Sequence, residues 1–138
     1  MNATTTSSSD EYLSPLARVR RVLVVDGDHE HQLLTRTILR MLELPADVAK
    51  TGAAALEAMA SGSYDLMIMD ISLPDMSGHE LVRALRRSPR TRATRVLAHS
   101  VYVLPGDVDR AFAAGCEGFI ERPYTLRGLE RAIGALFA

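Results

Sequence analysis

Four residues whose side chains can take part in chemistry stand at the ends of short hydrophobic runs. Asp26 ends the run VLVVD, Asp70 ends LMIMD, Ser100 ends RVLAHS, and Arg122 lies just past GFIE. Together they suit phosphoryl transfer, with one carboxylate as nucleophile, a second carboxylate that helps to hold Mg²⁺, and a hydroxyl and a cation for the phosphate oxygens. Two clustered carboxylates repel an incoming phosphate unless a divalent cation neutralises them, so Mg²⁺ is part of this hypothesis.

These four residues can act together only if the elements that carry them form one parallel sheet. Strand-length apolar runs alternate with segments of helical period, which predicts βαβ units. The predicted strands are Val22–Asp26, Asp47–Ala49, Leu66–Asp70, Arg95–Ser100 and Gly118–Glu121. The predicted helices are Glu30–Leu42, Ala53–Ala60, Gly78–Arg87, Gly106–Ala114 and Thr125–Phe137. Open sheets of this (βα)5 kind bind ligands at the carboxyl ends of their strands, where the four residues lie.

The composition limits the number of domains, the kinds of partner and the cellular location that we expect. The 138 residues, 47% of them hydrophobic, suffice for one compact domain with a real core. A formal net charge of -1 gives no support to binding of nucleic acid or of an anionic membrane. The single cysteine, Cys116, excludes an internal disulfide, and no apolar run approaches the ~18 residues of a spanning helix, so we expect a cytoplasmic protein.

The first residues differ in composition from the rest of the chain. The stretch MNATTTSSSDEYLSP is rich in serine and threonine and lacks both a basic start and an apolar core, so it is not a secretory signal. We expect a disordered leader over residues 1–17 and one folded domain over residues 18–138.

Three blocks of the sequence resemble receiver domains of bacterial two-component response regulators. They are VLVVDGDHEHQLLTRTIL, YDLMIMDISLPDMSGHELVRALR and VLAHSVYVLPGDVDRAFAAGCEGFIERPYT, and the resemblance covers about residue 20 to the C-terminus. The middle block is the most specific, because a hydrophobic strand that ends in Asp is followed by Leu-Pro and then by Met-Ser-Gly at a helix start. The resemblance implies a flavodoxin-like (βα)5 α/β fold, a doubly wound five-stranded parallel sheet of order 2-1-3-4-5.

The resemblance also implies a role for each site residue. Asp70 would accept the phosphoryl group, and Mg²⁺ would be held by Asp26, Asp70 and the backbone carbonyl of Ser72. Ser100 would be the switch hydroxyl and Phe119 the aromatic switch. The family further places a cis peptide before the proline that follows its basic residue, here at Arg122-Pro123, an isomer that proline makes accessible.

The sequence departs from the family pattern after the first strand. Receivers usually carry two adjacent acids there, whereas this chain has Asp26-Gly27-Asp28, and glycine offers no side-chain oxygen. Asp28 could reach back to the metal, because residues two apart share a face of an extended segment. It could instead N-cap the following helix, which is the reading we favour. With one metal carboxylate missing, we expect weakened Mg²⁺ affinity and slow phosphorylation.

A second departure is Arg122, where the family has lysine with few exceptions. Lysine presents a compact ammonium that can swing to a new phosphate, whereas the arginine guanidinium is bulkier and forks onto carboxylates. Lys50 is the only lysine and follows the second strand, so it is a poor substitute. The arginine is either a neutral exchange in an arginine-rich sequence or a functional change.

Other chemically suggestive residues have structural explanations. Met67 and Met69 flank Ile68 in a predicted buried strand, and we expect both to be core residues. Cys116 reads as a small packed residue in a turn. The four histidines, His29, His31, His79 and His99, are scattered over different elements and do not make a convincing metal set.

The leading hypothesis is a stand-alone response regulator that is not an enzyme in the ordinary sense. A histidine kinase or phosphotransfer protein would phosphorylate Asp70, and the change would alter binding of a downstream protein by the last two helices. The resemblance leaves open a homodimer through the face formed by the predicted helix Gly106–Ala114, the predicted strand Gly118–Glu121 and the predicted helix Thr125–Phe137.

Two alternatives remain. The first is a pseudo-receiver interaction module that needs no phosphate, in which Arg122 pairs permanently with Asp70. The second, a distant one, takes Asp26 and Asp28 as the Asp-x-Asp pair of haloacid-dehalogenase-type phosphatases. The chain lacks the cap and the later acidic motif of those enzymes.

Overall fold

Five parallel strands form one sheet in the computed structural model, which describes residues 15–138. The sheet order is β2-β1-β3-β4-β5, so the predicted flavodoxin-like order is confirmed. The strands are β1 (Val22–Val25), β2 (Ala46–Ala49), β3 (Leu66–Asp70), β4 (Arg95–Ser100) and β5 (Gly118–Glu121). All residues of β1 and the first four of β3 are buried, which explains why both read as continuous apolar runs.

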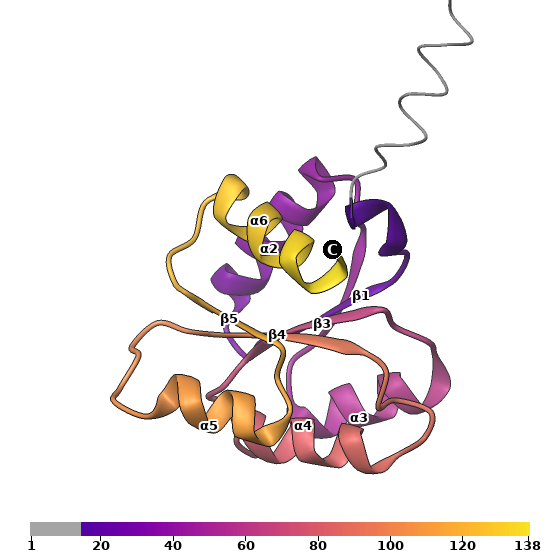
Figure 1. Ribbon diagram of the computed structural model, residues 1–138, viewed down its shortest axis with the longest axis vertical. Coiled ribbons are helices and arrows are strands. Elements are labelled where there is room, and N and C mark those ends of the chain that lie inside the picture. The colour runs from indigo at the N-terminus through magenta and orange to yellow at the C-terminus, as the bar shows by residue number, and fades with distance from the viewer. Residues whose placement is uncertain (1–14) are drawn as a thin grey trace, which may run out of the picture.

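Helices cover both faces of the sheet. They are α2 (His29–Met41), α3 (Gly52–Ser61), α4 (Gly78–Arg87), α5 (Asp107–Ala114) and α6 (Leu126–Phe137). Helices α2 and α6 lie on one face, and α3, α4 and α5 lie on the other (Figure 1). The predicted elements are all present, with ends that differ by at most one residue. None of these described helices has the length and apolar character needed to cross a membrane.

The buried face of α2 is not the one that its apolar residues suggest. Leu33, Leu34 and Met41 are 59%, 43% and 66% exposed. The helix instead buries two polar side chains, Gln32 and Thr35, together with Ile38 and Leu39. Those polar side chains face the carboxyl end of the sheet, where both have hydrogen-bond partners.

The start of the described chain contacts its end. Residues 1–14 of the predicted leader lie outside the described residues. Residues 15–18 form a short 3-10 helix, η1 (Pro15–Arg18), in which the Arg18 guanidinium donates to the Phe137 carbonyl at 3.3 Å. Val19 is 5% exposed and belongs to the core under α2 and α6. Leu16 of η1 is partly buried against the same core, so this short helix packs on the folded domain.

A glycine sets the approach of α4 to the end of β3. Ser77 N-caps this helix, its hydroxyl accepting from the Glu80 amide at 3.2 Å. A Cβ on the next residue, Gly78, would lie 2.8 Å from the Ile71 Cα and 3.0 Å from the Asp70 carbonyl oxygen. Only glycine therefore lets the helix backbone pass this close to the strand end that presents the Asp70 side chain.

Candidate functional site

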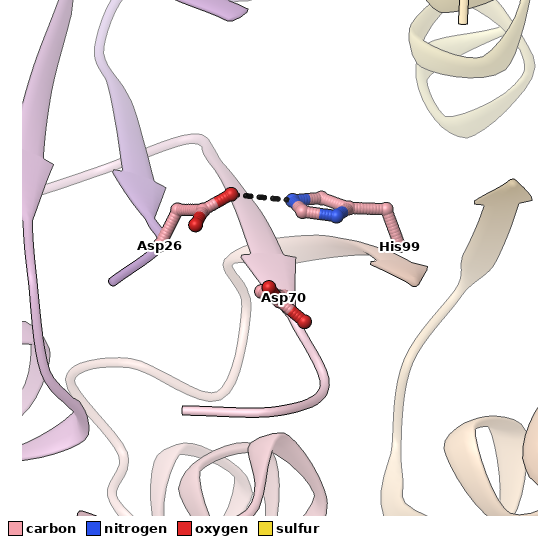
Figure 2. A group of neighbouring side chains, drawn as sticks. All are labelled: Asp26, Asp70 and His99. Carbon is pink, nitrogen blue, oxygen red and sulfur yellow. Dashed lines mark ion pairs between the residues drawn. The ribbon is translucent and has the colours of Figure 1, made fainter. Parts of the chain in front are cut away.

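The sheet register brings three side chains together at the carboxyl ends of the strands. Val25 pairs with Met69, and Asp70 pairs with His99, so Asp26, Asp70 and His99 lie at one level. One ligand atom from each of the three lies within 4.8 Å of the others. Figure 2 shows Asp26 and His99 extending toward each other, with Asp70 at the end of β3 between them. The predicted meeting of Asp26 and Asp70 is therefore present in the structure.

Asp26 is wholly buried, and its two carboxylate oxygens have different surroundings. Oδ1 accepts a hydrogen bond from the Asp28 amide at 2.9 Å. Oδ2 has no hydrogen-bond partner in the described part of the chain but faces nitrogen atoms of His99, His31 and Arg122 at 3.5, 3.8 and 3.9 Å. Burial raises the pKa of Asp26, and the Asp28 amide and the Arg122 charge partly offset that rise.

Asp70 is the acid of the cluster that lies open to solvent. Its side chain is half-buried and lines an open pocket of about 400 Å³. The same pocket is lined by Asp28, His31, Ser72 and Pro74. Oδ1 accepts from the Ser72 amide at 2.8 Å. Burial raises the pKa of Asp70, and the neighbouring Asp26 charge raises it further against the lowering by the Ser72 amide.

Asp28 caps the helix that follows it. Its side chain accepts from the His31 amide at 3.0 Å with extended backbone, which makes it the N-cap of α2. The same hydrogen bond lowers the pKa of Asp28. The structure thus shows the favoured N-cap reading, and the carboxylate of Asp28 is not part of the cluster of Asp26, Asp70 and His99.

The loop after β3 closes over Gly27. A Cβ on Gly27 would lie 3.0 Å from Cγ of Pro74, so a side chain there would press on the loop. Asp75, the next residue, accepts from the Gly52 and Ala53 amides at 2.8 and 2.9 Å and so ties the loop to the start of α3. This role of Asp75 could not be predicted from the sequence, because its partners lie more than 20 residues away in the chain.

Ser100 and Phe119 occupy neighbouring strands on the far side of Asp70. Ser100 is 6% exposed, and its hydroxyl donates to the Tyr102 carbonyl at 3.0 Å. Phe119 is partly buried against the core between the sheet and α3 to α5. Val101, Tyr102 and Leu104, in the loop after Ser100, are exposed.

Arg122 is held on the side of the site that faces α2. It is 6% exposed, and its Nη2 donates to the His31 carbonyl at 3.3 Å and to Oγ1 of Thr35 at 3.5 Å. The guanidinium carbon lies 5.0 Å from the centre of the Tyr124 ring, whose hydroxyl is hydrogen-bonded to Thr35. The Arg122-Pro123 peptide is cis, as the resemblance implied.

The ion pair of Arg122 differs from the one considered in the sequence analysis. Its carboxylate partner among the described residues is Asp26, at 3.9 Å, whereas the pseudo-receiver hypothesis paired it with Asp70. The reason is the anchoring of the guanidinium by α2 and Tyr124, which cannot be read from the order of residues along the chain.

His99, which the sequence placed among four scattered histidines, lies in the site beside the two acids. Its side chain is wholly buried, and its ring meets that of Tyr124 edge to face at 6.0 Å. Burial lowers the pKa of His99 to about 3, and the Arg122 charge contributes, so the ring is neutral at physiological pH. A histidine directly before Ser100, in an otherwise apolar run, was the available signal.

The donor set at the strand ends fits a divalent cation. Oδ2 of Asp26 is buried and unpartnered, and Asp70 adds a second carboxylate within reach. Oxygen ligands of this type hold Mg²⁺ in proteins. Gly27 and the capped Asp28 leave the set with two carboxylates and the imidazole of His99.

Comparison with known proteins agrees with the fold. The sequence model of the response regulator receiver domain matches residues 22–134. The chain is 28% identical over 118 residues to the chemotaxis protein CheY of Pseudomonas aeruginosa, covering 85% of this chain and 95% of that protein. It is 35% identical over 125 residues to the aerobic respiration control sensor protein ArcB of Escherichia coli, covering 90% of this chain. The chain spans only 16% of the length of ArcB.

Solved structures share the same architecture. A putative response regulator from Chloroflexus aurantiacus superposes with a TM-score of 0.82 at 22% identity, covering 87% of this chain and 98% of that chain. The receiver domain of sensor histidine kinase PA1611 from Pseudomonas aeruginosa, with magnesium coordinated in its active-site cleft, gives a TM-score of 0.80 at 23% identity and covers 86% and 98%. The chain belongs to the response regulator receiver domain family of two-component signalling.

Proposed function

We propose that this receiver domain accepts a phosphoryl group on Asp70 from a histidine kinase or phosphotransfer protein in the cytoplasm. The observation that carries the proposal is the pairing of an accessible and a buried carboxylate. Asp70 lines the open pocket, and Asp26 lies behind it with an unpartnered oxygen. The first can meet a phosphodonor while the second helps to hold a divalent cation.

In phosphoryl transfer the protein mainly positions the reacting groups and stabilises the charge on the transferred group. A carboxylate oxygen of Asp70 attacks the phosphorus, the bond from phosphorus to the donor breaks, and the donor leaves with the bond electrons. The Ser72 amide, 2.8 Å from Oδ1, orients the carboxylate. Mg²⁺ held by Asp26, Asp70 and the Ser72 carbonyl, as in the receiver family, would neutralise charge on the transferred group.

Ser100 and Phe119 would carry the response to the surface. The Ser100 hydroxyl must leave the Tyr102 carbonyl to reach a phosphoryl oxygen, and Tyr102 is 82% exposed in the loop before α5. Phe119 is only partly buried, so its ring has room to follow. The proposed output is altered binding of a downstream protein, or of a second copy of the chain, at the face formed by α5, β5 and α6.

A second candidate function is a phosphate-independent receiver. The observation that favours it is the anchoring of Arg122 at Thr35, the His31 carbonyl and Tyr124, which keeps the family's basic residue from serving the phosphate. In this case the fold presents one fixed surface to its partner. The ion pair with Asp26 would take over part of the role of the cation.

One experiment separates the two. The purified protein is incubated with acetyl phosphate and a divalent cation, and its intact mass is measured beside Asp70→Asn and the exposed control Asp109→Asn. The proposal expects one added phosphoryl group on the wild type and on the control, and none on Asp70→Asn. No addition to the wild type, with any of the divalent ions tried, would favour the phosphate-independent function.

A further inference from the structure

The buried histidine at the end of β4 lacks the hydrogen bonds that such a residue needs. His99 is 0% exposed, and neither Nδ1 nor Nε2 has a hydrogen-bond partner among residues 15–138. A buried polar group without a partner carries a free-energy cost, so nearly all such groups in proteins are hydrogen-bonded or have a function. An apolar residue at this position would remove the cost without any loss of strand structure.

The ring points at the candidate metal site. Its Nε2 lies 3.5 Å from Oδ2 of Asp26, an oxygen that is itself unpartnered, and Asp70 completes the group within 4.8 Å (Figure 2). Two ligands on a tetrahedral ion with bonds of ~2.0–2.1 Å are separated by roughly 3.4 Å. The separation of the histidine nitrogen and the aspartate oxygen therefore already matches that of two ligands on one ion.

We propose that the cluster of Asp26, Asp70 and the imidazole of His99 at the strand ends binds a transition-metal ion of the zinc class in preference to Mg²⁺. Mg²⁺ selects oxygen ligands, whereas a neutral imidazole suits Zn²⁺ and the other later first-row ions. In this chain the imidazole supplies the third protein ligand that Gly27 fails to supply. Use of the ion in phosphoryl transfer rests on the proposed function, but its binding does not.

Two further groups face the same oxygen of Asp26. The Arg122 charge lies 3.9 Å away, and His31 Nδ1 lies 3.8 Å away on the α2 side. The guanidinium repels every divalent ion and so lowers affinity for all of them by a similar factor. The imidazole of His99 discriminates between ions, because its nitrogen binds Zn²⁺ far better than Mg²⁺. Selectivity, rather than absolute affinity, is therefore the quantity to measure.

The test compares ions across one substitution. Affinities for Zn²⁺ and for Mg²⁺ are measured by calorimetry on the wild type, on His99→Leu and on His29→Asn, an exposed histidine at the start of α2. Leucine is similar in size to histidine and has no unpartnered nitrogen, so the fold is expected to persist, and thermal unfolding checks it. We expect His99→Leu to lose at least roughly tenfold in Zn²⁺ affinity and to keep its Mg²⁺ affinity, while His29→Asn changes neither.

A spectroscopic measurement identifies the ligand directly. With histidine labelled with ¹⁵N, Zn²⁺ should shift the Nε2 resonance of His99 in the wild type and in Asp70→Ser, the latter at higher ion concentration. Equal losses of Zn²⁺ and Mg²⁺ affinity in His99→Leu would overturn the proposal. So would a shift at the exposed His29 with none at His99, which would reveal surface binding.

Failure of this inference and failure of the proposed function give different results. If Asp70 is phosphorylated in Mg²⁺ and Zn²⁺ binding does not depend on His99, the metal proposal alone is wrong. If Zn²⁺ binds through His99 and no ion supports phosphorylation of Asp70, the metal proposal stands and the phosphate-independent function gains support.

Discussion

Nη2 of Arg122 lies 3.9 Å from Oδ2 of Asp26, and both side chains are almost completely shielded from solvent. Removing one member of a buried pair leaves the other charge uncompensated, which typically costs about 3 to 5 kcal/mol. The long separation and the raised pKa of Asp26 argue for the lower end of that range. The pair therefore helps to hold the Arg122 side chain in place, and the Arg122 charge partly offsets the rise in the pKa of Asp26.

The first prediction concerns this pair. Arg122→Met is expected to lower the free energy of unfolding by about 3 kcal/mol in the wild type and by clearly less in an Asp26→Asn background. Chemical denaturation of the four proteins of the cycle measures the difference. Equal costs in both backgrounds would show that Arg122 acts through Thr35 and Tyr124 alone.

The second prediction restores the residue usual in the family. In Arg122→Lys the ammonium has no planar fork to hold at the His31 carbonyl and Thr35, so it is free to reach a phosphoryl group on Asp70. We expect phosphorylation by acetyl phosphate to be roughly tenfold faster, the effect of one charge-assisted contact. The exposed Arg127→Lys is the matched control, and a rate equal to that of the wild type would argue against a functional role of this departure.

The third prediction concerns the missing carboxylate. Gly27→Asp adds an oxygen beside Asp26, at the expense of pressure on Pro74. We expect Mg²⁺ affinity to rise by about tenfold or more, while Gly27→Ala, which carries the same Cβ, leaves affinity unchanged and reports the steric cost alone. Calorimetric titration measures both variants. Identical affinities in the two would mean that this position does not reach the ion.

The fourth prediction separates the two roles considered for Asp28. Asp28→Ala should lose about 1 kcal/mol of stability with the cap of α2, whereas Asp28→Asn should retain nearly all of it. Neither variant should weaken metal binding by more than about threefold, because the carboxylate lies outside the ligand cluster. Ser77→Ala, which removes the cap of α4, is the reference for a pure capping loss. A large loss of metal affinity in both variants would instead show that the Asp28 side chain binds the ion.

The fifth prediction concerns Cys116, which is 4% exposed and packs in the core. Burial raises its pKa to about 12, so at pH 8 only about one thiol in 10⁴ is ionised in the folded protein. Because the thiol keeps its proton in the folded state and loses it near pH 9 when unfolded, stability falls as pH rises from about 9 to 12. Modification by a thiol reagent at pH 8 should follow unfolding by urea; rapid labelling without denaturant would contradict this burial.

Much of this molecule could be predicted from local patterns. The apolar runs of β1 and β3 and the helical periods between strands identified every element of the βα repeat, because burial on both faces of a sheet leaves a direct mark in composition. The convergence of Asp26 and Asp70 followed, since parallel strands end at the same edge of the sheet. The N-cap role of Asp28 is equally local, because a cap and its amide are three residues apart.

Other features depended on contacts between distant residues. The direction of Arg122 follows from Thr35 and Tyr124, which approach it only because α2 and α6 pack on the same face of the sheet. The exposure of Leu33 and the burial of Thr35 follow from the same packing, against what the apolar spacing alone suggests. His99 meets Asp26 across β3 through strand register, so a histidine that looks isolated in the sequence becomes a candidate ligand only in the folded sheet.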